Sequence, residues 1–178
     1  MRQLRILQMR VMGLDVSATA TGIAVLACAD GKVEKLHEEE VCSKKKGLAR
    51  AMEIADRVNE QIETWKPDEI AVEGYSFGSK FTLVILVEVG TVVRMVLHMH
   101  GRRWLDVPPT SLKKFVTGSG KGEKDKIMLE LYKRWGLDPA SNNTGDAMGA
   151  AVTLLGMQGK IPVTKVQQEA IKKLVFCN

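Results

Sequence analysis

The N-terminal part of the chain contains three extended segments with the lengths of ordinary strands. Residues 11–16 and 21–28 are short apolar runs, and a third extended segment, residues 33–38, follows the turn signal Asp30-Gly31. Strands joined by a tight Asp-Gly turn usually pair as an antiparallel hairpin. The pattern therefore predicts an antiparallel meander of three strands, in which Gly22 relieves crowding at the start of the second.

Helical spacing dominates the rest of the chain. Between residues 46 and 65 the apolar positions recur at steps of three and four, which is typical of an amphipathic helix. Residues 81–100 are rich in Val, Ile and Thr, but twenty residues without a turn signal exceed a normal strand, so we predict a buried helix. The remaining predicted elements are strands at 69–73 and 104–107, helices ending near 116 and 135, and a last core helix at about 144–157.

Three meander strands followed by strands alternating with helices predict an α/β fold. We expect a five-stranded mixed sheet, with an antiparallel meander plus parallel strands, flanked by helices. A chain of 178 residues suits one domain, which we assign to residues 1–158, with a C-terminal tail and short helix at 159–178.

Composition narrows the class of protein. With 45% hydrophobic and 26% charged residues, the chain is not a disordered, collagen-like or disulfide-stapled sequence. The three cysteines are widely spaced and predict reduced thiols, which favours a cytoplasmic location. Glu88 and Arg94 interrupt the most apolar stretch, and Gln8 and Arg10 interrupt the N-terminal one, so we expect neither a membrane span nor a signal peptide.

Three carboxylates stand at the ends of predicted elements. Asp15 lies in the first strand, Glu73 ends the strand at 69–73, and Asp146 opens the last core helix among small residues. Each could have an ordinary role, as a turn former, an ion-pair partner or a residue that favours the helix N-terminus. Taken together, they can converge at one sheet edge, where carboxylate oxygens would bind hard cations such as Mg²⁺, with Mn²⁺ as a substitute.

Two asparagines precede Asp146 within one helical turn. Asn142 and Asn143 would share a helix face with Asp146 if the helix began before them. Either could instead cap the helix, which is a common role of asparagine. An asparagine carbonyl can also bind Mg²⁺, but it brings no negative charge.

Most of the excess positive charge lies in one segment. The net charge of the chain is +5, and residues 110–135 carry seven basic and three acidic side chains, a net +4. The glycines of the loop at 117–122 would let the backbone approach a phosphate. A nucleotide-binding P-loop is excluded because Gly122 is followed by Glu123 rather than Lys, so we expect no nucleotide cofactor. Basic candidates for DNA contacts are Lys113, Lys114, Lys121, Lys124 and Lys126.

A second set of candidates follows Glu73. Tyr75 and Phe77 lie in a glycine-flanked loop with Lys80 beside them. An aromatic ring there could stack on an unpaired base, and Lys80 could contact a phosphate. The alternative is that the rings fold back onto the core.

Four segments together resemble a known family. GLDVSATATGIAVL, IAVEG, VPPTSLKKFVTGSGKGEKDKI and GDAMGAAVTL occur in the order and spacing of the RuvC-type Holliday-junction resolvases, of the ribonuclease-H-like superfamily. The resemblance covers residues 12 to about 156 and is strongest to phage-encoded members. It implies a Mg²⁺-dependent, two-metal endodeoxyribonuclease, with Asp15 as the bridging ligand and Glu73 and Asp146 each on one ion, and it places Lys113 and Lys124 at DNA-contacting positions.

The sequence departs from the family at Asn143, where a further acid is usual. The departure leaves three interpretations: the amide oxygen acts as a ligand, the role has moved to another residue, or catalysis is weakened. The family also implies a homodimer, since a four-way junction has two symmetric scissile strands, and we assign much of the interface to residues 81–100.

Three other functions compete with junction resolution. An RNA-processing nuclease of the same superfamily would use the same acids, and a junction-binding protein with weakened catalysis would fit Asn143. DVSATATG also resembles the first phosphate-binding turn of actin-like and sugar-kinase-like ATPases, but these need two such domains and a longer chain than 178 residues.

Overall fold

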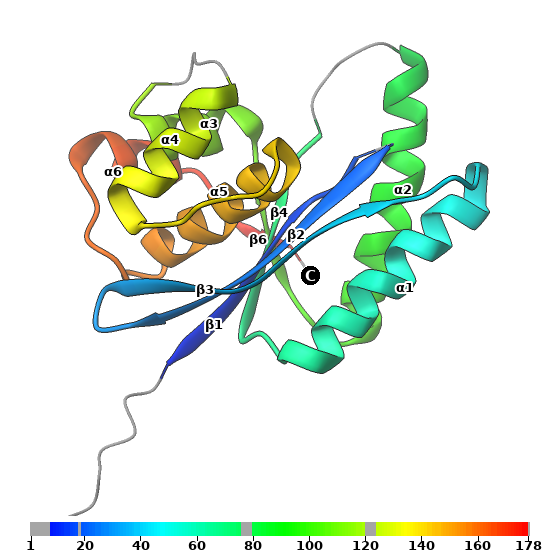
Figure 1. Cartoon of the computed structure of the whole chain (residues 1–178), viewed down its shortest axis with the longest axis horizontal. Helices are drawn as coiled ribbons and strands as arrows, with labels where there is room; N and C mark the ends of the chain where they lie inside the picture. Colours follow the sequence, from blue (N-terminus) through cyan, green and yellow to red (C-terminus); the bar gives the residue numbers. More distant parts are fainter. Residues whose placement is uncertain (1–7, 18, 76–79, 120–123, 178) are drawn as a thin grey trace, which may run out of the picture.

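A six-stranded mixed sheet forms the centre of the molecule (Figure 1). The computed structural model describes residues 8–17, 19–75, 80–119 and 124–177, without the side chains of 80–82, 124 and 125. The elements are β1 (Met9–Asp15), β2 (Ala20–Ala29), β3 (Lys32–Cys42), α1 (Gly47–Trp65), β4 (Glu69–Glu73), α2 (Lys80–Met99), β5 (Trp104–Val107), α3 (Pro109–Thr117), α4 (Lys124–Trp135), α5 (Asn142–Met157), α6 (Lys165–Ile171) and β6 (Phe176–Cys177).

The strand order β3-β2-β1-β4-β5-β6 combines both kinds of pairing. The strands β1, β2 and β3 form the predicted antiparallel meander, while β4 runs parallel to both β1 and β5. The central strands are apolar on both faces: Val11, Met12 and Leu14 of β1 are fully buried. Such strands need helices on both sides of the sheet.

Helices cover the two faces in unequal groups. The helices α1 and α2 pack on one face, where Ile54, Val58 and Val93 join one buried cluster (Figure 1). The helices α3, α4, α5 and α6 cover the other face around a second cluster that includes Phe115 and Leu154. The expected class of fold, an open mixed sheet flanked by helices, is confirmed.

Close approach of α5 to the sheet depends on two glycines. A Cβ at Gly13 would lie 1.9 Å from the backbone oxygen of Ala147, and one at Gly22 would lie 2.1 Å from that of Asn143. No other residue fits at such distances, so these glycines let the helix backbone rest directly on β1 and β2. The N-terminal turn of α5 is thereby held over the meander.

The structure differs from the sequence-based expectation at two edges of the sheet. The sheet has six strands rather than five, because Leu105 and Trp104 of β5 pair with Phe176 and Cys177 of β6. A strand of two residues is too short to show a period of two. The strand β3 also continues past Glu38 to Cys42, through a run of alternating exposure that its many charged residues conceal.

The segment after Met157 packs against the rest of the molecule. Ile161, Ala170 and Leu174 are buried in the same cluster as Phe115. The α6 residue Gln167 donates a hydrogen bond to the backbone oxygen of Phe115 at 3.1 Å.

The long apolar helix α2 is confirmed as a helix. Within the described part of the chain, none of the helices has the length and apolar character that a membrane span requires.

Candidate metal and nucleic-acid site

Asp15, Glu73 and Asp146 meet at one end of the sheet. Asp15 ends β1 and Glu73 ends β4, and since these strands are parallel neighbours, with Leu14 beside Val72, their last residues lie at the same edge. Asp146 comes from the first turns of α5, which the glycine contacts hold over β1. One carboxylate oxygen of each residue lies within 4.8 Å of those of the other two. The sequence-based expectation that these three acids come together is thus realised in the fold.

The cluster is electrostatically unfavourable without a cation. Asp146 is buried, and Asp15 and Glu73 are half-buried. Burial first, and then the charges of Asp15 and Asp146, raise the pKa of Glu73 to about 10, and a hydrogen bond with Asp15 adds to the shift. Three carboxylates this close cannot all be ionised cheaply, but a divalent cation would favour their ionised forms. The donor set, three carboxylates at a partly open site, therefore fits a hard divalent ion.

The N-terminus of α5 is capped by Ser141, not by either asparagine. The Ser141 hydroxyl accepts a hydrogen bond from the backbone N–H of Thr144 at 3.2 Å, and the Thr144 hydroxyl accepts one from the Ser141 N–H at 3.1 Å. The helix therefore begins at Asn142, so Asn143 lies one turn before Asp146 on the same face. The side-chain nitrogen of Asn143 donates to Glu40 Oε2 at 3.1 Å.

Glu38 and Glu40 of β3 contact the start of α5, although no pattern in the sequence singled them out. Glu38 accepts a hydrogen bond from the backbone N–H of Ala140 at 2.9 Å, and Glu40 accepts one from the Ser141 hydroxyl. Glu39, between them, points to the other face and pairs with Arg57 of α1. If the predicted strand had been extended through Glu38-Glu39-Glu40, the alternation of side chains between the two faces would have placed Glu38 and Glu40 together on one face.

The basic candidates differ in their surroundings. Lys113 lies near the carboxylates, since its charge lowers the pKa of Glu73 against the larger effects that raise it. Lys114, the next residue, instead pairs with Glu169 of α6 at 3.0 Å. Lys126 is exposed on α4. Lys121 lies outside the described residues, as do the side chains of Lys80 and Lys124.

Tyr75 lies against α2, and Phe77 is outside the described residues. Arg94 of α2 donates a hydrogen bond to the Tyr75 hydroxyl at 3.0 Å, and its guanidinium lies 4.7 Å from the centre of the ring. Arg94 also pairs with Asp106 of β5 at 2.6 Å. Of the two placements expected for the rings, Tyr75 has the one that folds back.

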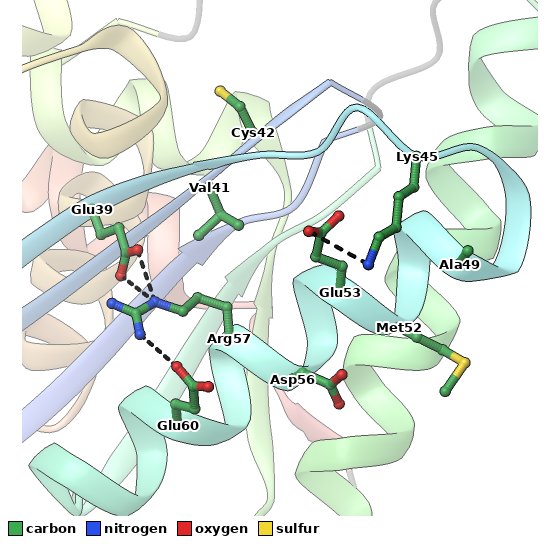
Figure 2. Close-up of a pocket in the computed structure, with 10 residues that line it drawn as sticks. All are labelled: Glu39, Val41, Cys42, Lys45, Ala49, Met52, Glu53, Asp56, Arg57 and Glu60. Carbon is green, nitrogen blue, oxygen red and sulfur yellow. Dashed lines mark hydrogen bonds and ion pairs between the residues drawn. The ribbon is translucent and has the colours of Figure 1, made fainter.

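A separate hollow of about 520 Å³ lies between β3 and α1, on the face of the sheet away from α5 (Figure 2). Four acidic side chains line it: Glu39, Glu53, Asp56 and Glu60. Its two basic side chains are engaged in ion pairs, Arg57 with Glu39 and Glu60, and Lys45 with Glu53 at 3.6 Å. An acidic hollow whose two basic side chains are already paired does not suit a phosphate.

Comparison with known proteins identifies the family. The family model described as "Crossover junction endodeoxyribonuclease RuvC" matches residues 11–154. A crossover junction endodeoxyribonuclease RuvC of Prochlorococcus marinus (strain MIT 9312) is 30% identical over 159 residues, covering 85% of this chain and 99% of the relative. The corresponding protein of Prochlorococcus marinus (strain MIT 9303) is 28% identical over 150 residues, covering 82% and 97%.

A solved structure shows the same fold. Thermus thermophilus RuvC in complex with a Holliday junction substrate superposes with a TM-score of 0.75 at 22% identity, over 88% of this chain and 99% of that one. Residues 11–154, which the family model matches, include all three clustered carboxylates. The chain therefore belongs to the RuvC family of crossover junction endodeoxyribonucleases.

Proposed function

We propose that this protein is a structure-selective endonuclease that resolves four-way DNA junctions by metal-dependent hydrolysis of phosphodiesters. The observation that carries the proposal is the convergence of Asp15, Glu73 and Asp146 within 4.8 Å, in a chain of the RuvC family. A Holliday junction is also the substrate bound in the Thermus thermophilus RuvC complex that superposes on this chain.

The three carboxylates would hold two Mg²⁺ ions, with Mn²⁺ as a substitute. By the family resemblance, Asp15 would contribute to holding both ions, and Glu73 and Asp146 would each contribute to one. When bound, such a pair of ions activates a water and stabilises the leaving 3′ oxygen in an in-line attack. Asn143 would add a neutral oxygen ligand one helical turn from Asp146.

The protein's own side chains would position the scissile strand. Lys113 lies close enough to Glu73 to influence its pKa, so it can pair with a phosphate that approaches the carboxylates. The α4 helix begins at Lys124 and carries the exposed Lys126, which extends the basic surface along the DNA.

Replacing Lys113 with alanine is expected to lower the rate of junction cleavage by about 10- to 100-fold, because a charge aimed at the reacting phosphate is lost. Lys114→Ala is the matched control, since that ammonium pairs with Glu169 instead of facing the carboxylates. Single-turnover rates on a labelled junction measure both variants. Equal losses in the two variants would contradict the placement of Lys113 beside the scissile phosphate.

We also propose a homodimer, so that two sites can act on the two symmetric strands of a junction. The α2 helix exposes Val84, Val87, Met95 and Met99, with exposures of 69%, 41%, 54% and 76%. At 100° per residue these four fall within about 120° of the helix circumference. An apolar face of this kind on one helix is typical of an interaction surface.

The double variant Val84→Glu/Met95→Glu is expected to convert the dimer into a monomer and to abolish paired cleavage, because buried unpaired charges would oppose association. Leu129→Glu, an equally drastic change at an exposed position of α4, should leave the dimer intact. Sedimentation at micromolar concentrations gives the state of each. A wild-type protein that is strictly monomeric there would overturn the dimer.

The function itself is tested by comparing three labelled substrates, a four-way junction, a linear duplex and an RNA hairpin, with Mg²⁺ or Mn²⁺. Symmetric paired nicks in the junction alone are the expected result. Preferential cleavage of the RNA hairpin would favour the RNA-processing alternative. Tight junction binding without nicks would favour an architectural protein in which Asn143 marks weakened catalysis.

A further inference from the structure

Glu40 lies in line with Asp15 across the sheet. On β2, Gly22 pairs with Asp15 on one side and with Glu40 on the other, so the three residues share one face. Since Gly22 has no side chain, the backbone of Asn143 occupies the space above it, 2.1 Å from where a Cβ would stand. Asn143 therefore lies above Gly22, with Asp15 and Glu40 on the two flanking strands.

Glu40 is too far from the cluster to be a ligand with the three acids. Two strand spacings separate it from Asp15, about 10 Å between their backbones. Among the described acidic residues, histidines and cysteines, the group that could share an ion consists of Asp15, Glu73 and Asp146. Any effect of Glu40 on the site therefore passes through Asn143.

The contact between Glu40 and Asn143 fixes which end of the amide faces which way. A carboxylate only accepts hydrogen bonds, so the amide must turn its nitrogen toward Glu40, as the 3.1 Å contact shows. The Ser141 hydroxyl donates to the same carboxylate oxygen and helps to hold it in place. The carbonyl oxygen of Asn143 is then on the other side of the amide from Glu40.

This orientation matters because the two ends of an amide differ, whereas the two oxygens of a carboxylate are equivalent. An aspartate at position 143 would offer an oxygen to a cation in either flip of its side chain. An asparagine offers an oxygen in one flip and a repelling NH₂ group in the other. A ligand of this kind needs a partner that selects the flip, as residues behind metal ligands commonly do.

We propose that Glu40 is a positioning residue that selects the amide flip of Asn143, so that the carbonyl oxygen faces the metal ion held by Asp15 and Asp146. The inference rests on the proposed function, because it takes the three carboxylates as the metal site. It also accounts for the asparagine at position 143, where the family usually has an acid. The negative charge lies instead on Glu40 of β3, and it acts on the site through the amide of Asn143.

The test is a set of Mn²⁺ dissociation constants, measured by calorimetry without DNA, for Glu40→Gln, Asn143→Asp and the double variant. Glu40→Gln should weaken Mn²⁺ binding about 10-fold, since glutamine can accept the amide in either flip. In the Asn143→Asp background the same change should leave the affinity unchanged or improve it, because a carboxylate needs no orientation and Glu40 would repel it.

Glu38→Gln is the matched control, since Glu38 contacts the backbone of Ala140 and should not alter the affinity. Glu40 is exposed, so its substitution leaves the core intact. Equal weakening by Glu40→Gln in both backgrounds, or none with Asn143 present, would overturn the proposal. Failure of the proposed function is distinguished by the wild type, which would then bind no Mn²⁺, or by Asp15→Asn, which would then bind it undiminished.

Discussion

Asp15→Asn is expected to lower the rate of junction cleavage by at least about 10³-fold, which corresponds to about 4 kcal/mol of transition-state stabilisation. The carboxylate of Asp15 lies within 4.8 Å of those of Glu73 and Asp146, and the family resemblance gives it a role at both ions. The change replaces one carboxylate oxygen with an NH₂ group, so it removes one negative charge and keeps the shape of the side chain. Junction affinity should therefore stay within about threefold of the wild type.

Glu69→Gln is a suitable control for this variant. Glu69 lies on β4 at the opposite end from Glu73 and pairs with Arg103 at 2.9 Å. Single-turnover cleavage and junction binding, measured side by side, give both quantities. If Asp15→Asn cleaved as fast as Glu69→Gln, the carboxylate cluster would not be the catalytic site.

The second large effect concerns the stability of the metal-free protein. Burial and neighbouring carboxylates raise the pKa of Glu73 from its ordinary value of 4.5 to about 10. Between these values the folded protein binds a proton that the unfolded chain has lost, so stability falls as pH rises from about 4.5 to about 10. For one proton the slope is at most about 1.4 kcal/mol per pH unit.

Glu73→Gln removes the titrating group, so the variant should be more stable than the wild type at pH 9 in EDTA, with little difference at pH 4.5. Urea unfolding across this range measures the two slopes. Glu69→Gln again serves as the control and should follow the wild type. Parallel curves for Glu73→Gln and the wild type would contradict the buried, mutually repelling cluster.

Added Mg²⁺ should narrow the difference in stability between the wild type and Glu73→Gln. An ion that binds the folded state alone at 100 times its dissociation constant stabilises it by about 2.7 kcal/mol, or roughly 5–10 °C in Tm for a chain of this size. The wild type should gain this increment at pH 8, and Glu73→Gln should gain much less. Equal gains would indicate that the ion binds elsewhere.

Periodicity was sufficient to predict most of the elements, because their apolar residues pack into the two buried clusters that flank the sheet. The helix at Lys80–Met99 was recognisable in spite of its Val and Ile content, since its length excludes a strand. The strand at Phe176–Cys177 was not, because two residues carry no period and their place depends on pairing with Trp104 and Leu105. A short strand at the edge of a sheet is determined by the distant residues with which it pairs.

The site residues also divide into those that local sequence reveals and those that depend on distant partners. Asp15, Glu73 and Asp146 stood out because each is a charge beside apolar neighbours at the end of an element. Glu40 did not, since it follows two other glutamates on an edge strand, where charged residues are common. Its relation to Asn143 arises from the packing of α5 over Gly22, a contact between residues 121 positions apart.

We expect Asp15, Glu73 and Asp146 together to bind the ions that support cleavage. The most direct measurement is anomalous scattering from a crystal of the protein soaked in Mn²⁺ at a concentration that supports junction cleavage. The expected result is anomalous density bounded by the carboxylate oxygens of these three residues. Crystals with Mn²⁺ bound only at other positions, from protein that cleaves junctions at that concentration, would contradict it.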